Sequence, residues 1–139
     1  MILDSSVYAS IVVVDESYEK AKNVLKLASR EKAATVDIVF SEVANVLWKH
    51  VFLFKRIDAK EIKERLCLFL ELVDKTSRIF SSRDLLNEAV EIATKYGLSV
   101  YDSLYLSLAI RLKCKLYTFD LGLRDRLSNT DLREIILIP

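Results

Sequence analysis

The sequence predicts a three-layer α/β/α fold with a central, mostly parallel sheet, in one domain covering residues 1–139. The chain has 139 residues, of which 52% are hydrophobic and 29% charged, so it can bury one substantial core. Two Gly and one Pro leave little room for long loops. Short apolar segments alternate with longer ones whose apolar residues recur every three or four positions. That alternation is typical of parallel strands joined by helices.

Five short apolar segments are the predicted strands. Helical patterns separate them, so each connection is long enough to cross over and start the next strand in parallel. Functional sites in such sheets form beyond the carboxyl ends of the strands, near the point where the strand order reverses. The predicted strands are Met1–Leu3, Ala33–Val36, Arg78–Phe80, Lys115–Phe119 and Glu134–Ile138.

Capping residues mark several of the predicted helices. Asp37 is expected to cap the helix that runs to about Lys55. Asp58 and Glu61 form a capping-box pattern for the next helix, and Gly97 fits a C-cap. The remaining helices are expected at residues 6–13, 17–30, 81–96, 101–112 and 121–127. Two inner stripes are predicted, one of Ile62, Leu66, Phe69, Leu70 and Val73, the other of Tyr101, Leu104, Tyr105, Leu108, Ala109 and Leu112.

Charge and cysteine content exclude several classes of protein. The net charge of +1 produces no overall basic field, so a nucleic-acid partner would be recognised through local charge. Cys67 and Cys114 lack metal-site spacing and are expected to be reduced, buried thiols of an intracellular protein. No apolar run approaches the roughly 20 residues that span a bilayer, and the apolar segment at 7–14 has no preceding basic residue. We therefore expect a cytoplasmic protein without a membrane partner.

Four acidic residues occupy positions that favour a shared site. Asp4 and Asp120 follow predicted strands, and Asp102 opens a helix. Taken singly, each is well explained as a helix cap or turn residue. Glu42 lies inside an apolar helix, where a solvated polar face explains it as well as a site does.

Considered together, the four acids predict a cation site. Carboxylates gathered at one sheet edge repel each other, so a fold that keeps them normally supplies a positive ion. Oxygen ligands suit Mg²⁺ or Mn²⁺. The single histidine, His50, cannot form a zinc site alone.

Four segments around these acids resemble the signature stretches of PIN domains, most closely those of the VapC-type toxins of toxin–antitoxin pairs. They occur in the family's order over nearly the whole chain. The segments are Ile2–Val7, Ser41–Leu47, Tyr101–Ala109 and Leu116–Asp120.

The resemblance implies a Mg²⁺- or Mn²⁺-dependent endoribonuclease with an RNA substrate, a cognate antitoxin and a homodimeric state. The four acids of the family's site fall on Asp4, Glu42, Asp102 and Asp120. In this hypothesis the three aspartates ligate the metal, and Glu42 either ligates it or orients a water molecule. Expected supporting residues are Ser6, Thr118 and Asn45, and Lys49 is a candidate RNA contact, although surface lysines are usually only solvated.

Two alternatives remain open at this stage. One is a stand-alone PIN-type RNA-processing or RNA-binding protein. The other is a receiver-like Mg²⁺-binding signalling domain, which a carboxylate inside a helix fits poorly. A separate question concerns an apolar segment at the end of the Glu42 helix, which either is buried in the core or forms a dimer or antitoxin interface. That segment contains Trp48, Val51, Phe52, Leu53 and Phe54.

Overall fold

A computed structural model describes residues 1–139 and has a five-stranded sheet in the order β3-β2-β1-β4-β5. Every neighbouring pair of strands is parallel, so the predicted fold class is confirmed. The strands are β1 (Ile2–Leu3), β2 (Ala33–Val36), β3 (Ser77–Phe80), β4 (Leu116–Tyr117) and β5 (Ile136–Leu137).

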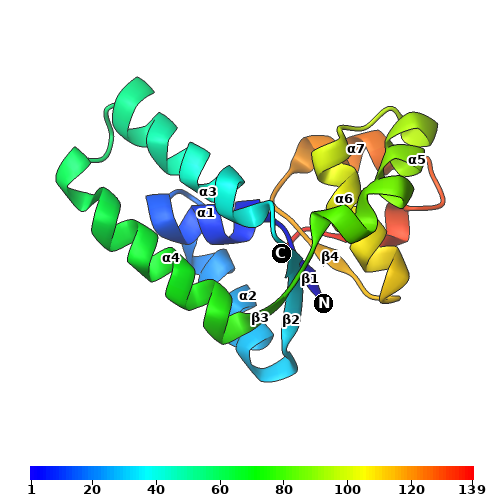
Figure 1. Ribbon diagram of the computed structural model, residues 1–139, viewed down its shortest axis with the longest axis horizontal. Coiled ribbons are helices and arrows are strands. Elements are labelled where there is room, and N and C mark those ends of the chain that lie inside the picture. The colour runs from blue at the N-terminus through cyan, green and yellow to red at the C-terminus, as the bar shows by residue number, and fades with distance from the viewer.

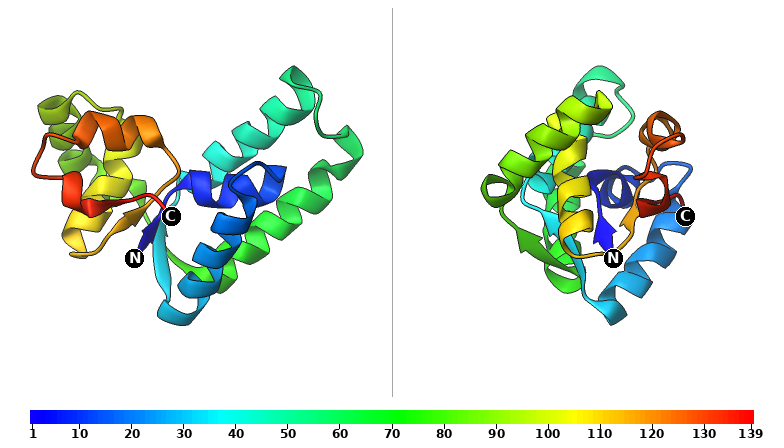
Figure 2. Two further views of the ribbon diagram at one scale, coloured as in Figure 1. Left: turned by 180° about the vertical axis from the view of Figure 1, so that it is seen from behind. Right: turned by 90° about the vertical axis from the view of Figure 1, so that its right-hand side faces the viewer.

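Seven α-helices connect the strands and cover both faces of the sheet. Helices α1 to α4 lie on one side and α5 to α7 on the other, and the two groups splay apart beyond the strands (Figures 1 and 2). The helices are α1 (Ser5–Val13), α2 (Tyr18–Glu31), α3 (Val39–Trp48), α4 (Ile62–Thr76), α5 (Leu86–Tyr96), α6 (Val100–Arg111) and α7 (Leu121–Leu127). A π-helical turn (Lys49–Leu53) extends α3, and short 3₁₀ turns occur at Ala59–Glu61, Ser82–Leu85 and Arg133–Ile135.

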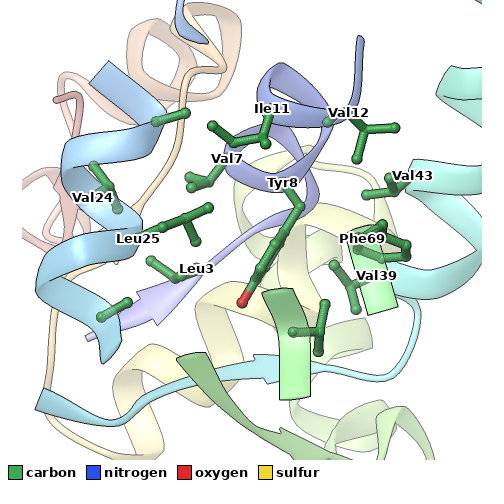
Figure 3. Close-up of a cluster of buried hydrophobic side chains, with 14 of the residues drawn as sticks. Leu3, Val7, Tyr8, Ile11, Val12, Val24, Leu25, Val39, Val43 and Phe69 are labelled. Atoms are coloured by element: carbon green, nitrogen blue, oxygen red, sulfur yellow. The ribbon is translucent and has the colours of Figure 1, made fainter. Parts of the chain in front are cut away.

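Alternate residues of the central strand β1 supply the cores of the two layers. Leu3 joins the cluster under α1 to α4, whereas Ile2 joins the cluster under α5 to α7. Side chains alternate across a strand, so two successive apolar residues can serve two cores. In the first core, Tyr8 and Phe69 are fully buried and their rings meet edge to face at 5.9 Å (Figure 3). The central strands therefore lie between two packed core layers.

Two of the three capping predictions are confirmed. Asp58 and Glu61 form a capping box, and Gly97 ends α5 with a φ of 65°. Asp37 does not cap α3, which has no side-chain cap. The carboxylate of Asp37 instead accepts a hydrogen bond of 3.0 Å from the backbone N–H of Ser82, beside the turn that leads into α5. The cap prediction fails because α3 begins at Val39, which puts Ile38 at the N-cap position and Asp37 one residue too early.

Several predicted buried residues are exposed. Leu70, Tyr101 and Leu112 face solvent, at the edges of stripes that are otherwise placed on the inner side. Helix α6 is instead buried around most of its girth from Ser103 to Ala109, since it lies between the sheet and α5. Cys67 is exposed and Cys114 half-buried, so the prediction that both thiols are buried is wrong, although neither forms a disulfide. No helix combines the length and apolar character needed to cross a membrane.

Candidate active site

The strand order reverses between β1 and β4. From β1 the chain adds β2 and β3 on one side, then crosses back to place β4 on the other side of β1. Asp4 directly follows β1, and Asp120 comes shortly after β4. The backbone N–H of Asp4 donates to the carbonyl of Tyr117 at 3.3 Å, which ties these two strand ends together. Both aspartates therefore lie at the kind of crevice where open α/β sheets build sites.

Asp4 caps a helix, and it is also an acid whose charged form is destabilised by burial. Its carboxylate accepts from the backbone N–H of Ser6 at 2.9 Å and from the Ser6 hydroxyl, so it caps α1 as its position predicts. The residue is nevertheless buried, with only 8% of its surface exposed. Burial raises the pKa of Asp4 to about 6, while hydrogen bonds from Ser6 and Thr118 oppose the rise and the nearby charge of Glu42 adds to it. The cap stabilises this carboxylate less than burial destabilises it.

Glu42 points toward the same region from the first turns of α3. Its carboxylate accepts a 2.7 Å hydrogen bond from the hydroxyl of Tyr105, which lies one turn beyond Asp102 on α6. Burial raises the pKa of Glu42, the hydrogen bond from Tyr105 lowers it, and the charge of Asp102 raises it again. The solvated-face explanation of Glu42 is therefore incomplete, because the side chain is half-buried and tied to a buried tyrosine.

Asp102 and Asp120 are held by other groups. The N–H of Asp102 donates to the Ser99 hydroxyl at 3.0 Å, which makes Ser99 the cap of α6. The carboxylate of Asp102 lies 3.3 Å from the guanidinium of Arg126. Asp120 caps α7 by accepting from the N–H of Leu123 at 2.9 Å. The cap explanation is thus correct for Asp4 and Asp120, and it does not conflict with a second role.

The two hydroxyl residues expected to support the acids are placed to do so. Ser6 bridges the strand ends, because its hydroxyl donates to Asp4 and accepts from the N–H of Phe119 at 2.8 Å. The buried Thr118 hydroxyl accepts from the N–H of Asp120 at 2.9 Å. Asn45 is exposed on α3 one turn beyond Glu42, and Lys49 is exposed one turn further on, where the π-helical turn begins. Asn45 makes no hydrogen bond to any of the four carboxylates, and its supporting role stays a prediction.

The donor set suits a hard divalent cation, although the side chains are not gathered into one cluster. No three His, Cys, Asp or Glu side chains lie close enough together to hold a metal ion as they stand. Asp4 and Glu42 nevertheless repel each other, as do Glu42 and Asp102. Arg126 is the single basic group paired with any of the four acids. Carboxylate oxygens are the ligands that Mg²⁺ and Mn²⁺ prefer, and a bound cation would relieve the repulsion between these acids.

Residues 1–126 match the model of the PIN-domain family, described as "PIN domain". This chain is a PIN-domain protein. It is 32% identical over 128 residues to Ribonuclease VapC3 of Pyrobaculum aerophilum, a match that covers 91% of this chain and 93% of that protein. Family membership confirms the resemblance of the four segments and leaves the receiver-like alternative without support.

The fold of this PIN-domain chain also matches a solved structure. The crystal structure of PAE2754 from Pyrobaculum aerophilum superposes with a TM-score of 0.67 and covers 90% of this chain and 77% of its own. At 23% sequence identity, that likeness establishes the shared fold alone.

Sequence reasoning missed two residues of this region. Helical periodicity predicts Tyr105 only as part of the inner stripe of α6, and no pattern predicts a role for Arg126. Tyr105 follows Asp102 by three positions, so helical spacing already places the two on one face. The available signal was the hydroxyl of Tyr105, because a tyrosine predicted to be buried needs a hydrogen-bond partner for that group. Arg126 had no comparable signal, because its approach to Asp102 depends on how α7 packs.

Proposed function

We propose that this PIN-domain protein is a metal-dependent endoribonuclease that hydrolyses phosphodiester bonds of RNA. The observation that carries the proposal is the buried Asp4, whose pKa is raised to about 6 and which has no basic partner. The pKa of the nearby Glu42 is also raised by burial. Perturbed acids at a strand-order reversal are typical of catalytic sites. The relationship to a protein named as a ribonuclease supports RNA as the substrate class.

Asp4, Glu42, Asp102 and Asp120 are the residues we assign to holding Mg²⁺ or Mn²⁺. Such an ion would neutralise charge on the phosphodiester and activate a water molecule for attack. The protein's own contribution is positioning. Ser6 fixes Asp4 relative to the β4 end, and Tyr105 fixes Glu42. The exposed Lys49, in the π-helical turn after α3, remains a candidate contact for an RNA phosphate.

RNA cleavage should depend on both the metal and Asp102. We expect purified protein to cleave total RNA with Mg²⁺ or Mn²⁺ and to lose activity with a chelator. Asp102→Asn should lower the rate at least about 100-fold, since it removes a ligand charge while preserving shape. Asp125→Asn, an exposed acid on α7, is the matched control and should stay active. Cleavage that survives both chelation and Asp102→Asn would rule out this mechanism.

Tyr105→Phe should weaken metal binding. The substitution keeps the buried ring but removes the hydroxyl that donates to Glu42, so the pKa of Glu42 rises and its carboxylate becomes a less available ligand. Lost outer-shell contacts typically cost about tenfold or more in metal affinity. Calorimetric titration with Mn²⁺ measures the metal affinity of wild type and variant.

Tyr8→Phe is the matched control for Tyr105→Phe. Tyr8 is equally buried, but its hydroxyl contacts the hydroxyls of Thr76 and Ser77 in the other core layer. That variant should lose about 1 kcal/mol of stability and keep its metal affinity. Equal metal affinity in the two variants would contradict the positioning role of Tyr105.

We also infer that the protein is a toxin held by an antitoxin and that it forms homodimers. An exposed apolar surface at the end of α3 supports an interaction site, and its exposure overturns the alternative that this segment is buried in the core. Trp48 and Phe52 stack there at 5.4 Å with both rings accessible. Light scattering of the purified chain tests the dimer, because a monodisperse monomer would contradict it. Co-purification with the product of a neighbouring reading frame tests the antitoxin.

A further inference from the structure

A pocket lined in part by Glu42 lies next to the hydrogen-bonded network of the acids. Its volume is about 410 Å³, and it is lined by Ser41, Glu42, Asn45 and Tyr101. Pockets for small ligands typically measure roughly 300–1,000 Å³, so the space is adequate for one flat ring system. Because Glu42 belongs to both, the pocket adjoins the candidate active site directly.

Two helices form the walls of this pocket. Asn45 lies one turn beyond both Ser41 and Glu42 on α3, so its side chain is a neighbour of each of theirs on the helix surface. Tyr101 is in the first turn of α6, immediately before Asp102. Each wall therefore carries one of the four acids, and a molecule in the pocket would extend from that site.

Tyr101 is the most informative residue of the pocket. Its side chain is 63% exposed, although helical periodicity predicts it on the inner face of α6. It is placed in the first turn, before the buried section that starts at Ser103. An accessible aromatic ring beside a catalytic site offers a stacking surface, and unpaired RNA bases stack on such rings.

The charge of the lining selects the part of a nucleotide that fits. Glu42 is the one charged residue that lines the pocket, so a phosphate group there would be repelled. An uncharged base meets no such penalty. The exposed amide of Asn45 can donate and accept hydrogen bonds at once, which matches the adjacent donors and acceptors on base edges.

We propose that Tyr101 and Asn45 form a subsite for one unpaired nucleobase of the RNA, next to the phosphodiester bond that the four acids cleave. This inference rests on the proposed function, because it assigns the pocket to the same RNA. Base stacking on Tyr101 holds the nucleotide, and the Asn45 amide contacts its edge. The subsite favours RNA whose base is free to leave a helix over fully paired RNA.

Free nucleosides test the subsite without requiring cleavage. With a chelator present, titration with adenosine, guanosine, cytidine or uridine should shift the NMR signals of the Asn45 side-chain amide and the Tyr101 ring. Ribose 5-phosphate, which lacks a base, should leave them unchanged. Tyr101→Ala should weaken nucleoside binding roughly tenfold, whereas Tyr101→Phe keeps the ring and should bind nearly as tightly. Val100→Ala, a neighbouring change outside the pocket lining, is the matched control.

Cleavage kinetics provide the second measurement. For a single-stranded RNA, Tyr101→Ala should reduce kcat/KM roughly tenfold, mainly through KM, with unchanged Mn²⁺ affinity. Equal binding of ribose 5-phosphate and nucleosides, or an unaffected Tyr101→Ala variant, would overturn the subsite. Signals that respond to protein concentration and not to nucleosides would assign the pocket to a protein interface and also overturn it. Nucleoside binding without any RNA cleavage would instead contradict the proposed nuclease function alone.

Discussion

Replacing Asp4 with Asn is expected to abolish RNA cleavage and, at the same time, to stabilise the metal-free protein. Asn keeps the oxygen that accepts from the Ser6 N–H, so the cap of α1 survives. It removes a buried charge whose pKa is raised to about 6 from 3.8, a shift that corresponds to about 1–3 kcal/mol of destabilisation at neutral pH. The opposing attraction between a carboxylate and a helix N-terminus is about 0.3–1 kcal/mol, so relief of burial should dominate.

The stabilisation should also depend on pH, in a direction set by the raised pKa of Asp4. Below pH 3.8 the carboxyl is protonated in both the folded and the unfolded chain, so wild type carries no penalty. The penalty grows as pH rises toward 6 and is complete above it. Wild type should therefore be nearly as stable as Asp4→Asn near pH 4 and less stable than this variant at pH 7.5.

Thermal unfolding with a chelator at several pH values measures the Asp4 effect. The variant should melt several degrees higher at pH 7.5, and added Mn²⁺ should raise the melting temperature of wild type more than that of the variant. Asp74→Asn, an exposed acid on α4, should change neither stability nor cleavage. A metal-free Asp4→Asn variant that melts lower than wild type at pH 7.5 would show that Asp4 acts mainly as a helix cap.

Phe69→Ala should cost about 3–5 kcal/mol of folding free energy, the largest stability effect we expect from a single truncation. Phe69 is fully buried, and its ring lies edge to face with Tyr8 at 5.9 Å (Figure 3). It also lies edge to face with Phe40 at 5.8 Å. Truncation leaves a cavity where α1, α3 and α4 meet. A domain of this kind has roughly 5–15 kcal/mol in total, so the variant should be close to unfolding at room temperature.

Denaturant unfolding compares Phe69→Ala with Leu68→Ala. Leu68 is the preceding residue on α4 but is exposed, so its truncation should cost under about 1 kcal/mol. Because the two positions share a helix and a sequence neighbourhood, the difference isolates burial. Similar losses for both variants would mean that α4 does not present Phe69 to the core as the structure has it.

The path of the chain was largely predictable from local patterns. Apolar runs separated by helical periodicity located all five strands, and the predicted segments 33–36 and 121–127 coincide with β2 and α7. Such patterns work because the strand and helix periods of 2 and 3.6 residues are fixed by backbone geometry. Errors concentrate at stripe edges such as Leu70 and Leu112, where the width of the buried face depends on the neighbouring helix.

The site divides in the same way between local and tertiary information. Sequence alone identified Asp4, Glu42, Asp102 and Asp120 as the candidate acids, because motifs are read along the chain, and their shared role stays a prediction. It also predicted correctly that Asp4 and Asp120 follow strands of a parallel sheet, whereas the strand order that places them at its reversal came from the structure. What the tertiary structure alone decided is which groups meet across helices. Tyr105 donates a hydrogen bond to Glu42, and Arg126 forms an ion pair with Asp102. Asp37 accepts a hydrogen bond from the backbone of the turn before α5. These contacts join residues 24 to 63 positions apart, and no local propensity specifies the packing distances and helix rotations that create them.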